Sequence, residues 1–254
     1  MKAKTLFFLT VTCICILNLS CAQNKEEIDF KLNPTIGEER NYVYSTKTEG
    51  STAKMDTEIE LSFKVLSNKS GVIEYEVNVI SIVSETSLFG EPESYDSRKE
   101  VASMNESELT KHADFKNLLD STLLISMDSR GRIVKKLSFP NGERALNLPI
   151  DFNYFQMLFP DEKIKEGSSW ENEWTNMVLR GKMIEADYEV LKITEETVQI
   201  SSKLKIPAAS VLLDPTISRG KYSFERSTGL LINGSLKQKL IMGGKLKISF
   251  AQKD

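Results

Sequence analysis

The sequence predicts a mainly β protein, built from one or two strongly curved antiparallel sheets or an unclosed β-barrel, with one or two short helices on the concave side. Apolar and polar residues alternate through most of the chain, which is the period of strands with one buried and one wet face. Clusters of Gly, Ser, Asn and Asp separate these runs, as hairpin turns require. The same order of patterns recurs late in the chain, which favours two similar halves.

The clearest hairpin comes first. Residues 58–65, "EIELSFKV", and 72–82, "VIEYEVNVISI", flank the turn cluster "SNKSG" at 67–71. Alternation places a set of apolar side chains on one face of this hairpin. The set comprises Ile59, Leu61, Phe63, Val65, Ile73, Tyr75, Val77 and Val79.

Two further hairpins follow the same design. Residues 123–139 form two apolar-faced strands around "DSRG", and residues 230–250 form two around the glycine pair at 243–244. Their predicted inward residues are Leu123, Ile125, Met127, Ile133, Lys135, Leu137, Phe139, Leu230, Ile232, Leu236, Leu240, Met242, Leu246, Ile248 and Phe250.

Two stretches break the strand pattern. Residues 105–121 contain strong helix formers, and we predict a helix there with Ser107 as its N-cap. Residues 149–160 lie between two prolines and are rich in aromatics, so a short helix packed over the sheet is expected.

The folded part is predicted at 37–254, after a signal peptide at 1–20 and a flexible tether at 21–36. Half one, 37–140, opens on "GEERNYVYS"; half two, 164–254, opens on "GSSWENEW". Each half then gives a hairpin and a strand pair around a glycine turn, which indicates an internal duplication. Shared β-hairpin patterning is the alternative explanation.

The N-terminus predicts export. Lys2 and Lys4 precede an apolar run at 6–17 that is too short to cross a bilayer but suits a secretory signal. Small residues and Cys21 follow, and this ending resembles the lipobox of bacterial lipoproteins, in which the cysteine carries fatty-acyl chains such as palmitate. Asn18 lies three residues before the cysteine, at the position where a lipobox usually has leucine. Ordinary cleavage after Ala22 is the alternative.

Lipidation at Cys21 implies a protein anchored by its N-terminal lipid to a membrane of the bacterial cell envelope, with the outer membrane favoured. Its face, periplasmic or surface, stays open. The stretch "AQNKEE" resembles the lysine–acidic–acidic surface-export signal of some Bacteroidota lipoproteins, with an ordinary charged tether as the alternative.

Composition sets the remaining bounds. After Cys21 the chain contains no cysteine, so disulfides and cysteine metal sites are excluded from the folded part. The net charge is −3, and lysines and acids are interleaved along the sequence. We therefore expect no basic stripe and no nucleic-acid partner.

Candidate catalytic groups are sparse. His112, in the predicted helix, has no second histidine to build a zinc or triad site, so we interpret it as an ordinary helix residue. Glu171 and Glu173 share a strand face and are interpreted as solvated. Trp170 and Trp174 also share a face, where core anchoring is expected and a ligand mouth is the alternative. No metal or cofactor is predicted.

The order of "SCAQ", "GEERNYVYS", "DSRGRIV" and "IKEGSSWENEW" resembles a family of uncharacterised Bacteroidota lipoproteins. The resemblance covers most of the chain after the signal and implies no catalytic residue. More distantly the layout resembles periplasmic lipoprotein-carrier folds, which hold acyl chains in a half-open curved sheet.

The leading functional hypothesis is a non-enzymatic envelope lipoprotein that binds an apolar ligand, or an envelope protein, on its concave surface. An acyl-chain-sized groove is expected beneath the 105–121 helix. A cavity lined by residues such as Ile59, Phe63, Tyr188 and Trp170 would favour ligand binding. The alternative is a structural or interaction lipoprotein whose core is filled by its own side chains. A third hypothesis is an enzyme with an unrecognised acidic site.

Overall fold

The computed structural model describes residues 26–139, 157–176, 182–207, 216–240 and 244–253. Its strands form one antiparallel 12-stranded sheet, in the order β6-β5-β3-β2-β1-β12-β11-β10-β9-β8-β7, with β4 paired beside β3. The strands are β1 (Glu39–Glu49), β2 (Ala53–Lys69), β3 (Val72–Leu88), β4 (Glu91–Asp96), β5 (Thr122–Asp128), β6 (Ile133–Ser138), β7 (Ser169–Asn176), β8 (Lys182–Ile193), β9 (Thr197–Ile206), β10 (Thr216–Glu225), β11 (Leu231–Lys239) and β12 (Lys245–Gln252).

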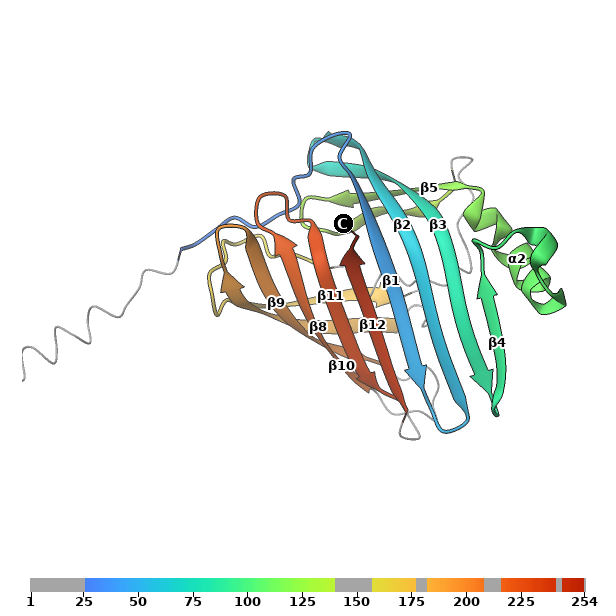
Figure 1. Ribbon diagram of the computed structural model, residues 1–254. Helices are drawn as coiled ribbons and strands as arrows, with labels where there is room; N and C mark the ends of the chain where they lie inside the picture. Colours follow the sequence, from blue (N-terminus) through green and yellow to red (C-terminus); the bar gives the residue numbers. More distant parts are fainter. Residues whose placement is uncertain (1–25, 140–156, 177–181, 208–215, 241–243, 254) are drawn as a thin grey trace, which may run out of the picture.

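The sheet is strongly curved and does not close, which confirms the predicted fold class (Figure 1). Its two ends, β6 and β7, do not pair with each other among the described residues. In the middle β1 pairs with β12, so the first and last strands of the chain join the two halves. The buried side chains form one core cluster on the concave face.

The predicted inward residues of the first hairpin are buried, with Phe63 partly so. Alternation dictates this, because turning the apolar face of each strand inward removes more apolar surface from water than the opposite orientation does. The turn between β2 and β3 consists of Ser70 and Gly71, which have φ values of 54° and 79°. Positive φ at both central residues is the geometry that tight hairpins prefer.

The helix α2 (Glu106–Leu119) lies over β3 and β4 at one edge of the sheet, preceded by the 3₁₀ turn η1 (Val101–Ser103). Its N-cap is Asn105, so the prediction of Ser107 was wrong. The Asn105 side chain accepts from the Glu108 backbone N–H, and the Glu108 carboxylate accepts from the Asn105 N–H. This reciprocal pair satisfies two backbone donors that a cap at Ser107 leaves unsatisfied.

Two segments outside the strands, 28–33 and 157–164, cover the concave face; we call them the covering segments. Their backbone N–H groups donate to the turns after β5 and β10: Leu32 to the Ser129 carbonyl, Asn33 to the Thr228 carbonyl and Phe159 to the Arg130 carbonyl. Ile28 and Ile164 pair as an antiparallel bridge between them. Phe30 is 2% exposed, so the predicted tether at 21–36 is too long: its apolar residues drive part of it into the core. Residues 157–160 are not helical; the rest of the helix predicted at 149–160 lies outside the described residues.

The halves share local geometry. Gly37 and Gly167 both have positive φ, and their N–H groups donate to the carbonyls of Val65 and Val190 respectively, each at 2.9 Å. The pairing of β2 and of β8 shifts register just after those valines. A common origin of the halves 37–140 and 164–254 stays a prediction that these shared features favour.

The predicted signal peptide and Cys21 lie outside the described residues. Within the described part of the chain, no helix has the length and hydrophobicity to cross a bilayer.

Candidate apolar-ligand site

A cavity of about 120 Å³ lies between the concave face and the covering segments. Strands from both halves of the sheet supply its walls, and Leu32, Met157 and Phe159 of the covering segments also line it. Its lining is mostly apolar and aromatic. The full lining is Leu32, Glu38, Arg40, Tyr42, Phe63, Val65, Tyr75, Met127, Gly131, Met157, Phe159, Phe224, Gly229, Leu230, Leu231 and Phe250.

Aromatic rings build the wall contributed by β1, β2, β3 and β12. Tyr42 stacks on Phe250 with ring centroids 4.7 Å apart, and Phe63 meets Tyr42 edge-on at 5.6 Å. Tyr75 lies 6.3 Å from Phe63 in a T-shaped arrangement. These are the offset and edge-to-face geometries that aromatic pairs favour, so the wall is stiff without being sealed.

A second aromatic group holds the covering segments to β10. Phe30 lies 4.7 Å from Phe159 and 6.0 Å from Phe224, and Phe159 lies 5.4 Å from Phe224. All three rings are buried. One residue from each covering segment thus meets one residue of the sheet, which fixes the cover over the cavity.

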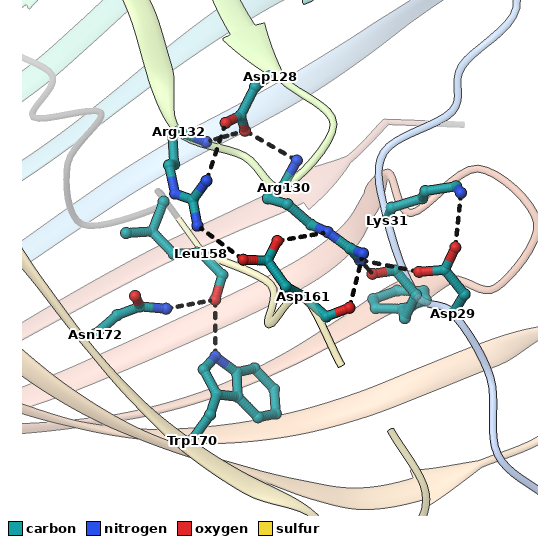
Figure 2. A network of polar contacts seen from close by, with 10 residues as sticks. Asp29, Lys31, Asp128, Arg130, Arg132, Leu158, Asp161, Trp170 and Asn172 are labelled. Carbon is teal, nitrogen blue, oxygen red and sulfur yellow. Dashed lines mark hydrogen bonds and ion pairs between the residues drawn. The ribbon is translucent and has the colours of Figure 1, made fainter. Parts of the chain in front are cut away.

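Arg130 ties both covering segments to the turn after β5 (Figure 2). Its guanidinium donates to the carbonyls of Phe30 at 2.9 Å and Asp161 at 3.1 Å, and it forms ion pairs with the Asp29 and Asp161 carboxylates. With a 15% exposed side chain, Arg130 is largely removed from water. Hydrogen bonds of a charged donor in such a place are stronger than exposed ones.

The other end of segment 157–164 is held by β7. The Leu158 carbonyl accepts from the Trp170 indole N–H at 2.7 Å and from the Asn172 side-chain amide at 2.9 Å (Figure 2). Trp170 also stacks on Tyr188 at 5.3 Å. The predicted anchoring role of this tryptophan therefore agrees with its contacts.

The polar rim of the cavity centres on Arg40, whose side chain is 14% exposed. Its guanidinium donates to Glu38 at 2.7 Å, to Glu225 at 2.6 Å and to Gln252 at 3.2 Å. A hydrogen bond from the Thr228 hydroxyl holds the pKa of Glu225 below its ordinary value, and a hydrogen bond from Arg40 adds a smaller effect in the same direction. Because the Arg40 donors are already engaged, the rim does not offer a free cation to an acidic ligand.

The two phenols in the wall stay neutral at ordinary pH. Burial raises the pKa of Tyr42 to about 12, against a smaller lowering by Arg40. Burial also raises the pKa of Tyr75. The chemistry offered to a guest is therefore that of apolar surface and neutral rings.

Of the candidate lining residues, only Phe63 lines this cavity. Ile59 is fully buried in the packed core, and Trp170 and Tyr188 stack on each other. The groove expected beneath the 105–121 helix was misplaced, because α2 lies over the β3–β4 edge while the cavity lies beneath the covering segments. Arg40 and Phe224 could not be predicted as lining residues, since the strand partners that bring them together are distant in sequence.

The remaining candidates lie elsewhere. His112 Nδ1 lies 3.1 Å from the Tyr95 hydroxyl, a contact that docks α2 on β4. Glu171 and Glu173 are exposed on β7, and Trp174 is buried. Among the described residues, no three His, Cys, Asp or Glu side chains gather as a metal site.

Comparison with known proteins adds a structural likeness. No family model matches the chain, and no curated protein matches it. A solved structure titled for lipid–protein interactions in lipovitellin is similar, with a TM-score of 0.56 and 10% sequence identity. The match covers 87% of this chain and 25% of that one, so this chain spans about a quarter of the lipovitellin chain. At this identity the likeness shows a shared fold alone.

Proposed function

We propose that the chain is a non-enzymatic lipoprotein of the bacterial cell envelope, acylated at Cys21, whose concave face binds an apolar group. The observation that carries the ligand proposal is the cavity beneath the covering segments, with its apolar and aromatic lining. The likeness to lipovitellin, whose structure is titled for lipid–protein interactions, is compatible with it.

The volume sets the size of the guest. An apolar cavity of about 150 Å³ engineered in another protein binds benzene. The cavity of about 120 Å³ here therefore suits a small ring or the end of an alkyl chain. A whole acyl chain enters only if Leu32, Met157 or Phe159 moves away from the concave face.

The second candidate is a structural or interaction lipoprotein with no small-molecule ligand. It is favoured by the packing of the concave face outside the cavity, where Ile59, Leu61 and Ile73 are fully buried. The two candidates differ in one property, namely whether an apolar molecule occupies the cavity.

A binding experiment separates them. Residues 24–254 are purified without lipidation, analysed by native mass spectrometry, and then titrated with an environment-sensitive fatty-acid probe. The Val65→Phe variant fills the cavity, and Val190→Phe changes a buried valine that does not line it. We expect the wild type and Val190→Phe to bind the probe and Val65→Phe to lose it. No bound lipid and no probe binding by the wild type would leave the structural role as the answer.

A further inference from the structure

The outer face of the sheet, opposite the cavity, carries a repeated charge motif. Each of four successive strands has two cations separated by one residue, and alternation turns both toward the same face. The pairs are Lys203 and Lys205 in β9, Arg219 and Lys221 in β10, Lys237 and Lys239 in β11, and Lys245 and Lys247 in β12.

Strand register places one cation from each pair, together with Lys47 of β1, in a row of five. Lys203 lies opposite Arg219, which lies opposite Lys237. Lys237 in turn lies opposite Lys247, which lies opposite Lys47 of β1. Neighbouring strands are about 4.8 Å apart, so the five cations span about 19 Å. The expectation of no basic stripe was wrong, because charges interleaved in sequence become neighbours across strands.

Acidic partners occur only at the ends of this row. Lys203 pairs with Asp187 at 3.5 Å, and Lys47 pairs with Asp56. Within the described residues, the central members Arg219, Lys237 and Lys247 form no ion pair. Like charges directly opposite in a sheet destabilise it. The row therefore lowers the stability of the sheet, and no acidic side chain among the described residues offsets the repulsion at its three central cations.

The five cations of the row line a trough with a volume of about 1600 Å³ on this face. Beside the row, Lys221 lies between Ser201 and Ser235, and these serines also line the trough. Among the described residues that line the trough, the one aromatic residue is Tyr188, which is 3% exposed and stacked on Trp170, so its ring is not presented outward. Three carboxylates, Glu49, Asp187 and Glu189, line the trough at its margins on β1 and β8. Between these margins the trough offers cations and hydroxyls without a stacking surface.

We propose that this trough binds an acidic polysaccharide. A row of cations about 19 Å long matches a polymer with repeated carboxylate or sulfate groups, and the adjacent serines match sugar hydroxyls. Single-stranded nucleic acid is disfavoured because its binding surfaces stack bases on aromatic rings. A hollowed face also fits a chain better than it fits a flat membrane. This inference is independent of the cavity on the concave face.

The test uses the purified full-length chain and two polymers, polygalacturonate and heparin, at low and physiological salt. The triple variant Arg219→Gln/Lys237→Gln/Lys247→Gln removes the centre of the row. Its matched control is Lys54→Gln/Lys64→Gln/Lys69→Gln, which removes three exposed lysines of β2 and changes net charge equally. We expect the first variant to lose about tenfold or more in affinity for both polymers and the control to change less than about twofold, since scattered exposed charges contribute little.

The thermal midpoint shows whether each variant is folded; the row variant is expected to match or exceed the wild type, because like-charge repulsion is removed. Absence of polymer binding by the wild type overturns the proposal. So does an equal loss in both variants, which indicates general attraction to net charge. Tighter binding of oligo-dT or of vesicles containing phosphatidylglycerol also overturns it and assigns the trough to another anionic partner.

Discussion

Val65 and Val190 show how one residue type in one backbone setting serves two environments. Both are buried, both accept a hydrogen bond from a positive-φ glycine, and both precede a register shift. Val65 faces the cavity, whereas Val190 packs within the core. The difference arises from the covering segments, because Leu32, Met157 and Phe159 leave space in front of Val65.

This difference predicts opposite responses to a larger side chain. We expect Val65→Phe to leave the free energy of unfolding unchanged or raised, since the ring enters existing space. Val190→Phe is expected to lower it by about 1–3 kcal/mol through overpacking. Urea denaturation of both variants measures the difference. Equal losses would mean that the space beside Val65 cannot accept a ring.

Cys21 carries the anchoring prediction. Cys21→Ser removes the thiol that accepts acyl chains, so the variant is expected to move from the membrane fraction to the soluble fraction. Fractionation of cells that produce either form measures the change. Identical distribution of variant and wild type would contradict the lipoprotein proposal, and protease added to intact cells then distinguishes surface from periplasmic display.

At the scale of elements, alternation predicted the strands well and covering elements poorly. Ile59, Leu61, Ile73 and Val77 are buried as their period requires, because each strand has only two faces. Segment 28–33 alternates too, with Ile28, Phe30 and Leu32 apolar, but the run is short and follows a polar stretch, so the tether prediction missed that Phe30 reaches the core. The cavity and the basic row were equally hidden, since both are made by strand register between distant residues.

The covering segment 28–33 depends on close backbone contact with the turn after β10. Gly229 has φ +70°, and a Cβ there would lie 2.4 Å from the Lys31 carbonyl oxygen. Gly71 has φ +79° with nothing within 4 Å of such an atom. Gly71→Ala is therefore expected to cost about 1 kcal/mol of strain alone.

Gly229→Ala is expected to cost clearly more than Gly71→Ala, because it also displaces Lys31. The free energy of unfolding gives the comparison, and limited proteolysis near residues 28–33 shows whether the segment loosens. An equal cost for the two substitutions would indicate that the segment moves freely and does not hold this wall of the cavity in place.

For the whole molecule, acid should weaken the fold. A hydrogen bond from Lys31 lowers the pKa of Asp29, and one from Arg130 adds a weaker effect in the same direction. The pKa of Glu225 is lowered in the same way by hydrogen bonds from Thr228 and, to a smaller extent, Arg40. Because these folded-state pKa values lie below the ordinary values of 3.8 and 4.5, their stabilisation is complete above pH 4.5. It is lost as the pH falls through the lowered values.

We therefore expect the free energy of unfolding to decline below about pH 4.5, and to decline less steeply in Glu225→Gln. Glu91→Gln, at an exposed carboxylate of β4 without an ion pair in the described structure, is the control and should follow the wild type. Urea titrations across this pH range provide the curves. Parallel curves for all three proteins would show that the contacts of Arg40 with Glu38 and Glu225 do not contribute to acid sensitivity.

The central claim is that the concave face retains an apolar space that a guest can occupy. A crystal structure of residues 24–254 under xenon pressure tests it most directly, because xenon enters dry apolar cavities without altering the sequence. We predict a xenon atom among Phe63, Val65 and Phe224, and its absence in the Val65→Phe protein. A wild-type structure with this space filled by Leu32, Met157 or Phe159, and no xenon bound, would contradict the claim.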